Sequence, residues 1–249
     1  MEAFGSTDVG CVRTNNEDYY LVAPSINLFL VADGMGGARA GEVASKLAAD
    51  TLWELVYKHE GAADLALLER AFLEANTRVV EAAAADYGKQ GMGTTMTAAI
   101  ATNDEISICH VGDSRFYEFR AGELNQVTSD QTWVNEVGRR LGLGDEALRK
   151  HPMRHVLTMA IGVTDDVQVQ SYTRKTEPET LYMLSSDGLH GVLKAPDIAG
   201  VLDSAGVLED KCRKLIDLAK DKGGPDNITV VLFRVRPTDE SHLRSTMGG

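Results

Sequence analysis

Apolar stretches of two kinds alternate along the chain: short continuous runs and longer repeats at helical spacing. Residues 18–23 are aromatic and β-branched and residues 28–32 are continuously apolar, so this part predicts two strands joined by a turn. Apolar residues then recur at helical spacing from 40 to 59, and Asp64 is a candidate N-cap for a further helix reaching about Tyr87. The first third of the chain therefore predicts a strand pair followed by a helix pair.

The same alternation continues to the end of the chain. Turn residues separate four β-like stretches, which predict an antiparallel meander at residues 94–101, 106–111, 115–120 and 124–127. Residues 128–165 are polar and mixed, with short helical candidates at 132–140 and 145–150, so they predict a flap over a rigid scaffold. The last elements predicted are strands at 167–173, 180–185 and 227–235 and helices at 196–202 and 208–221.

Strand and helix blocks follow one another without a linker, a repeat or a break in composition. One α+β domain over residues 1–237 is the simplest interpretation, with 238–249 as a loose C-terminal tail. The 249 residues are 25% charged and 43% hydrophobic, as in folded soluble proteins. We therefore expect a single folded unit.

The charge balance narrows the classes of function. Lys and Arg total 25 against 37 Asp and Glu, a net charge of −12, which argues against binding to nucleic acid or anionic membranes. No signal peptide and no apolar run of roughly 18 residues is present, so we expect a cytoplasmic protein, and nothing demands more than a monomer. Three widely spaced cysteines, Cys11, Cys109 and Cys212, predict reduced and mostly buried thiols rather than a disulfide frame or a zinc site.

Acidic residues recur where apolar strands end or begin. The four that lie next to Gly, Asn or Ser are Asp33, Asp113, Asp187 and Asp226. Asp-Gly is also typical of hairpin turns, so each one alone is interpreted as a turn. Together, carboxylates at the tips of buried strands can converge into a negative cluster, whose oxygen ligands favour Mg²⁺ or Mn²⁺ over Zn²⁺. Glu17 and Asp18 complete the number of acids that a two-metal site needs.

Arg13, four residues before Glu17, is a candidate phosphate ligand, because a guanidinium grips a phosphate with two parallel donors. The alternative is a surface arginine in a turn. The glycines from Gly34 to Gly41 match neither the dinucleotide nor the Walker pattern. They are more typical of a backbone that approaches a ligand closely, with the carbonyl of Gly34 as a candidate metal ligand.

Six motifs, taken in order, make the chain similar to a known family. They are Arg13–Asp18, Val31–Gly37, Gly91–Thr95, Val111–Arg115, Ser186–Gly188 and Pro225–Asn227. In order and spacing they resemble the metal-dependent protein phosphatase (PPM) family, type 2C, in its bacterial branch. The resemblance extends from about residue 3 to 236.

This resemblance implies a four-layer αββα sandwich, two antiparallel sheets flanked by helix pairs, and hydrolysis of phosphoserine and phosphothreonine on proteins with two or three Mn²⁺ or Mg²⁺ ions. Asp33 would bridge two ions, the Gly34 carbonyl would complete one, and Asp187 and Asp226 would hold the other. Asp113 would form a weaker third site with Asp187, Arg13 would hold the substrate phosphate, and Glu17 and Asp18 would act through metal-bound waters. The expected partners are a cognate kinase and its substrates, or a phosphothreonine-reading scaffold of a secretion system.

Several positions depart from the family pattern. They are Met35, where many relatives carry a histidine, Gly191, Gln131, Thr132, His155 and Met159. Those at 131, 132, 155 and 159 lie in the expected flap and suggest a distinct substrate preference. The alternative function, from another class, is a catalytically silent relative that binds phosphorylated proteins as a regulator.

Overall fold

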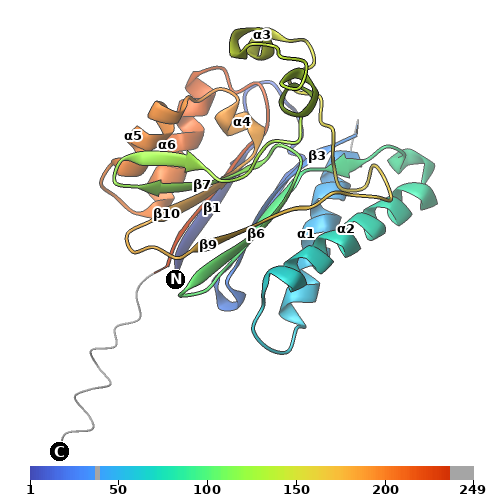
Figure 1. The fold of residues 1–249 in the computed structure, drawn as a ribbon, viewed down its shortest axis with the longest axis horizontal. Helices are drawn as coiled ribbons and strands as arrows, with labels where there is room; N and C mark the ends of the chain where they lie inside the picture. The colour runs from blue at the N-terminus through green and yellow to red at the C-terminus, as the bar shows by residue number, and fades with distance from the viewer. Residues whose placement is uncertain (37–39, 236–249) are drawn as a thin grey trace, which may run out of the picture.

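Two antiparallel sheets lie face to face between layers of helices in the computed structural model, which describes residues 1–36 and 40–235 (Figure 1). The first sheet has the order β1 (Glu2–Asp8), β11 (Ile228–Arg234), β10 (Leu181–Ser185), β7 (Arg115–Arg120) and β8 (Glu123–Gln126). The second has the order β2 (Asp18–Ala23), β3 (Leu28–Met35), β5 (Met96–Ala101), β6 (Glu105–Val111) and β9 (Gln170–Lys175), with β4 (Gly93–Thr94) beside β3. The expected αββα sandwich is confirmed.

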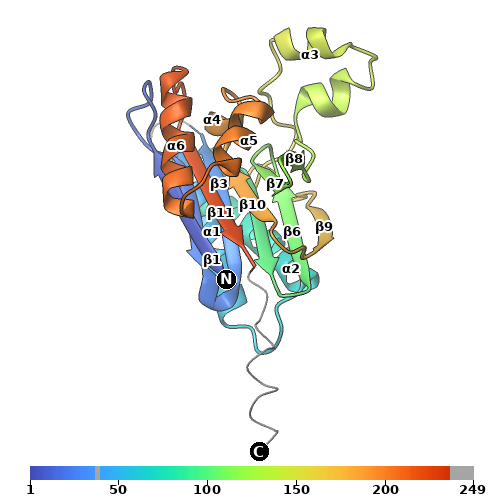
Figure 2. The same ribbon diagram turned by 90° about the vertical axis from the view of Figure 1, so that its left-hand side faces the viewer.

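Each sheet has its own helical cover (Figures 1 and 2). Helices α1 (Ala40–Tyr57) and α2 (Leu65–Ala85) pack on the second sheet, and α4 (Asp187–His190), α5 (Ala195–Asp203) and α6 (Leu208–Asp221) pack on the first. Short helical turns lie at Pro24–Ile26, Tyr87–Lys89 and Val134–Gly138. The predicted N-cap of α2 is confirmed, because the Asp64 carboxylate accepts the Leu67 amide at 2.9 Å. Among the described residues, no helix is long and apolar enough to cross a bilayer.

The core between the sheets explains why the strands are continuously apolar. Along β3, Phe29 and Val31 face the other sheet, while Leu28, Leu30 and Ala32 face the helices. Side chains on a strand alternate between its two faces, so a strand covered on both sides needs apolar residues at every position. Phe29 stacks on Phe233 of β11 with ring centroids 4.2 Å apart, which joins the two sheets.

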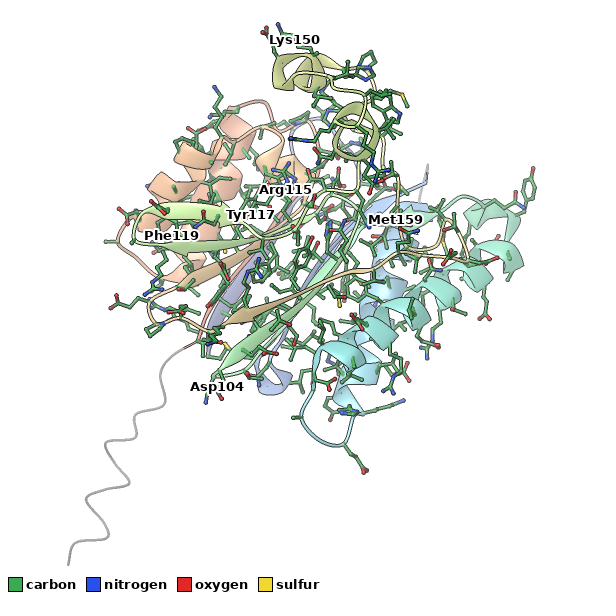
Figure 3. The ribbon with its side chains drawn as sticks, viewed as in Figure 1. Asp104, Arg115, Tyr117, Phe119, Lys150 and Met159 are labelled. Carbon is green, nitrogen blue, oxygen red and sulfur yellow. The ribbon has the colours of Figure 1, made fainter. Side chains whose placement is uncertain are left out.

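Residues 128–165 rise above one end of the sandwich (Figures 1 and 2). This segment, called the flap below, contains the turn Val134–Gly138 and helix α3 (Asp145–Lys150). Lys150 lies at its far end, and Met159 lies where it returns to the sandwich (Figure 3). The two legs of the flap meet in an antiparallel bridge between Thr132 and Leu157.

Three features differ from the expectations, and a fourth lies outside the described residues. Strand β1 was not predicted, because its small and polar residues show no alternation and its burial comes from pairing with β11 over the whole strand. The single turn α4 was also missed, since four residues carry no helical period. Cys109 and Cys212 are buried as expected, whereas Cys11 is exposed. The predicted tail, 238–249, lies outside the described residues.

Candidate active site

A pocket of about 1050 Å³ opens where the strands of both sheets end beneath the flap. The predicted site residues that line it are Arg13, Glu17, Asp33, Gly34, Asp113, Asp187 and Asp226. Asp18 is 8% exposed and does not line the pocket. It pairs with Asp33 across β2 and β3, so it lies next to the wall. The structure therefore brings together residues that are up to 213 positions apart in the sequence.

Threonines hold Asp33 in place through its backbone. The Asp33 amide donates to Thr95 Oγ1 at 3.1 Å, and its carbonyl accepts from the Thr94 hydroxyl at 2.9 Å and from the Thr95 amide at 2.8 Å. At Gly34, a Cβ atom would lie 2.2 Å from the carbonyl oxygen of Gly41. Only glycine therefore lets the start of α1 come this close to the strand.

The other carboxylates lie at comparable junctions of strand with turn or helix. Asp187 begins α4 directly after β10, where the lack of a side chain on Gly188 lets the helix touch the backbone of Asn227. Asp113 follows β6 in a turn whose Gly112 has φ +103° and packs against Thr95. Buried β-structure thus fixes each carboxylate at the pocket wall.

Asn227 is a positioning residue that the sequence reasoning missed. Its Nδ2 donates to the carbonyls of Val9 at 3.0 Å and Asn15 at 2.8 Å, and its Oδ1 accepts the Glu17 amide at 2.8 Å. One buried amide side chain therefore fastens the loop that carries Arg13 to the start of β11. The only available signal was its place in the motif Pro225–Asn227, in which Asp226 alone was given a role.

Arg13 faces the acids as the sequence predicted. Its Nη2 lies 2.8 Å from Asp226 Oδ2, and the two side chains are 51% and 33% exposed. This pairing raises the pKa of Arg13 through the hydrogen bond and the charge of Asp226. A cation is therefore kept at the open side of an otherwise acidic pocket.

The buried carboxylates raise one another's pKa values. Burial comes first, followed by repulsion from neighbouring carboxylates, and together they raise the pKa of Asp113 to about 8 and that of Asp33 well above its usual range. Burial also raises the pKa of Asp18 to about 7, against the hydrogen bonds that its Oδ2 accepts from Ser186 and Thr229. The pKa of Asp187 is raised by burial and by Asp226. Such a cluster is stable only with protons or cations between the carboxylates.

Two observations test whether these residues suit a metal ion. The carboxyl groups of Asp33 and Asp187 are close enough to affect the pKa of Asp187, so a proton or cation between them would relieve their repulsion. Asp18 Oδ1 is buried without a hydrogen-bond partner. In the part of the chain that the structure describes, no three His, Cys, Asp or Glu side chains close around one ion. Hard ions such as Mg²⁺ bind through one or two carboxylates and keep several waters, so the donor set fits them.

Two histidines beside the site, His110 and His190, have a structural role. His110 Nδ1 bonds to the Thr97 hydroxyl at 2.8 Å and His190 Nδ1 to the Ser185 hydroxyl at 2.9 Å, and neither ring lines the pocket. Burial lowers the pKa of His110 to about 4 and lowers the pKa of His190 well below its ordinary value. Both rings are therefore neutral at physiological pH.

The raised pKa of Asp113 predicts that Asp113→Asn increases the free energy of unfolding in a pH-dependent way. A carboxyl whose pKa is raised by folding does not destabilise the folded protein below about pH 4, its ordinary pKa. As the pH rises from there through about 8, the folded protein loses stability relative to the unfolded chain, which ionises more easily. In EDTA, the variant is expected to gain stability relative to the wild type between these values. Urea denaturation at a series of pH values measures the difference. The exposed Asp104, substituted in the same way, should show no such trend. A difference in the free energy of unfolding between Asp113→Asn and the wild type that does not change with pH would contradict the prediction.

Comparisons with known proteins agree on one family. The family model for protein phosphatase 2C matches residues 12–206. Protein phosphatase PhpP of Streptococcus pneumoniae is 33% identical over 245 residues, covering 96% of this chain and 99% of PhpP. The catalytic domain of the serine/threonine phosphatase PstP, solved in complex with two manganese ions, is 33% identical with a TM-score of 0.83, covering 93% of this chain and 96% of that one. PppA, a key regulatory component of T6SS in Pseudomonas aeruginosa, is 32% identical with a TM-score of 0.81, covering 94% and 96%.

Proposed function

Since this chain belongs to the protein phosphatase 2C family, we propose that it hydrolyses phosphoserine and phosphothreonine on proteins in a reaction that requires Mn²⁺ or Mg²⁺. The observation that carries the proposal is the convergence of four strand-end aspartates and Arg13 on a single pocket. The proposed phosphatase domain is residues 1–237 with the flap at 128–165, of which 37–39 and the last two residues lie outside the described parts.

In this proposal the carboxylates hold the ions. Asp33, the Gly34 carbonyl, Asp187 and Asp226 would hold two of them, and Asp113 with Asp187 a third and weaker one. When bound, such ions polarise the phosphoryl group and make water a stronger nucleophile at neutral pH. Glu17 and Asp18 contribute oxygens at the edge of the same set, and the bonds from Ser186 and Thr229 orient Asp18. A serine or cysteine nucleophile is not required.

Arg13 would bind the phosphate of the substrate. Its guanidinium has further donors besides the one used by Asp226 and lies at the exposed side of the pocket, where a phosphorylated side chain enters. A phosphate dianion bound there accepts charge-assisted hydrogen bonds from the guanidinium, which stabilise its negative charge during transfer. Asp226 keeps the guanidinium oriented before substrate arrives.

The proposed substrates are phosphorylated proteins made by a bacterial serine/threonine kinase, including the kinase itself. A further proposed substrate is a phosphothreonine-reading scaffold of a secretion system, and the likeness to PppA, a regulatory component of T6SS, supports the link to secretion. The other candidate is a catalytically silent regulator that binds phosphorylated proteins. It gains support from the same relative, whose described role is regulatory.

Phosphate release from a phosphothreonine peptide tests the proposal. The wild type is expected to be active with Mn²⁺ or Mg²⁺ and inactive in EDTA. Asp187→Asn should lose about a hundredfold in kcat/KM, because one carboxylate is removed from the set proposed to hold the ions. Activity in EDTA would contradict the metal requirement. An absence of turnover with every metal, together with retained binding of the peptide, would favour the silent regulator.

A further inference from the structure

The flap contributes two basic side chains to the pocket, Arg154 and His155. The other arginine of the pocket, Arg13, is already engaged with Asp226 at 2.8 Å. Among the side chains that the structure describes, no carboxylate lies within ion-pairing distance of Arg154. Arg154 is therefore a guanidinium at the pocket whose donors are available to an incoming group.

Backbone bonds hold the segment that carries these two residues. The Trp133 amide donates to the carbonyl of Val156 at 2.8 Å, and the Thr158 amide donates to the carbonyl of Gln131 at 2.9 Å. The Trp133 ring stacks on that of His151 with centroids 4.5 Å apart. The second leg of the flap is thus tied to the first on both sides of Arg154.

Gln131 ties the flap to the wall of the pocket. Its Oε1 accepts the Gly112 amide at 2.8 Å, its Nε2 donates to the Gln168 carbonyl at 2.9 Å, and its own amide donates to the Gly112 carbonyl at 2.7 Å. The side chain is only 3% exposed. Because Gly112 precedes Asp113, these bonds fix the base of the flap relative to the acidic wall of the pocket. Arg154 and His155, farther along the flap, line the same pocket.

One of the two basic side chains of the flap lies close to the carboxylates. The charges that act most strongly on the pKa of Asp187 are those of Asp226, His155 and Arg13. His155 therefore lies near the acidic wall, and Arg154 lines the same pocket. The protein carries a net charge of −12, which repels an acidic substrate unless a local cation offsets it. With Arg13 occupied by the phosphate to be removed, Arg154 remains for a second negative group.

We propose that Arg154, with His155 beside it, forms a subsite for an anionic group next to the phosphorylated residue of the substrate. The group is a carboxylate side chain or a second phosphate, both of which a guanidinium binds with two donors. The subsite deepens the proposed function and rests on it, because it selects among phosphorylated proteins. With this subsite, acidic and multiply phosphorylated segments bind more tightly and are hydrolysed with a higher kcat/KM than neutral segments.

Three phosphothreonine peptides test the subsite, flanked by glutamates, by a second phosphothreonine or by glutamines. For the wild type, kcat/KM on each anionic peptide should exceed that on the glutamine peptide by about threefold to tenfold. Arg154→Ala should bring this ratio close to one, and Arg154→Lys should restore part of it. Arg140→Ala is the matched control, because Arg140 is an exposed arginine of the flap that does not line the pocket. Added salt should reduce the preference.

A binding measurement separates the subsite from catalysis. Versions of the three peptides with a non-hydrolysable phosphonate are titrated with fluorescence anisotropy as the readout, so the preference is measured even where no phosphate is released. A preference for anionic peptides that is present in the wild type and in Arg140→Ala and absent from Arg154→Ala supports the subsite. Equal affinities in the wild type overturn it. An equal loss for all three peptides in Arg154→Ala also overturns it, because Arg154 would then contact the reacting phosphate. A preference for only one anion identifies the group that is read.

Discussion

Asp33→Asn is expected to lower kcat/KM on a phosphothreonine peptide by about a thousandfold or more and, in EDTA, to stabilise the protein. The loss follows from the place of Asp33 between the two sheets, facing Asp187 and proposed to contact both ions. The gain follows because burial and the charges of Asp18 and Asp187 already oppose ionisation of this carboxyl. Removing its charge removes that repulsion. Kinetics with Mn²⁺ and urea denaturation in EDTA measure the two effects.

The expected loss of activity together with a gain in stability distinguishes a local chemical effect from unfolding. Asparagine has nearly the shape of aspartate, and the contacts that fix residue 33 use its backbone, so the strand should keep its place. Asp104→Asn, at an exposed position, should change neither quantity. Wild-type activity in Asp33→Asn would refute the proposed role of this carboxylate. A fall in stability in EDTA would refute the account of repulsion.

Gly188→Ala is expected to damage both the fold and the activity. A Cβ atom at this position would lie 1.9 Å from the backbone oxygen of Asn227, so the start of α4 must move away from β11. Asp187 and Asp226 lie on the two sides of that contact. We expect a loss of about 1–3 kcal/mol in the free energy of unfolding and of at least about tenfold in kcat/KM, since displacements of about 1 Å have such effects.

A second glycine in a nearby helix supplies the control. A Cβ atom on Gly200 of α5 meets no atom within 4 Å, so Gly200→Ala should gain about 0.5–1 kcal/mol through the helix propensity of alanine. Urea denaturation and peptide kinetics on both variants make the comparison. If Gly188→Ala kept wild-type stability and activity, the close contact between α4 and β11 would not determine the geometry of the site.

The sequence predicted the helices with a regular apolar spacing and the strands that are covered on both faces. Helix α6 was expected at the bounds it has, because its apolar residues recur at a regular helical spacing. Continuous apolar runs marked β3 and β11, since both faces of each strand are covered. Strand β1 could not be found this way. Its residues are half-buried throughout and depend on a partner more than 200 positions away.

The site was predictable to a similar extent. Each strand-end aspartate taken alone is interpreted as a hairpin turn, and only the recurrence of four of them after or before buried runs indicates a site. Which of them face one pocket depends on the order of the strands, which local pattern does not encode. The same limit hid Asn227, whose three bonds reach the N-terminal segment, and Arg154, which only the path of the flap brings to the pocket.

The pairing of β1 with β11 sets the order of events during synthesis of the protein. Arg13, Glu17 and Asp33 leave the ribosome early, but the first sheet and the pocket lack a side until Ile228–Arg234 has emerged. Folding must then join segments that are distant in the chain, which is slow compared with local pairing. A nascent chain, or one cut before the last strand, therefore has no competent site, and phosphatase activity should appear only after translation has passed the final strand.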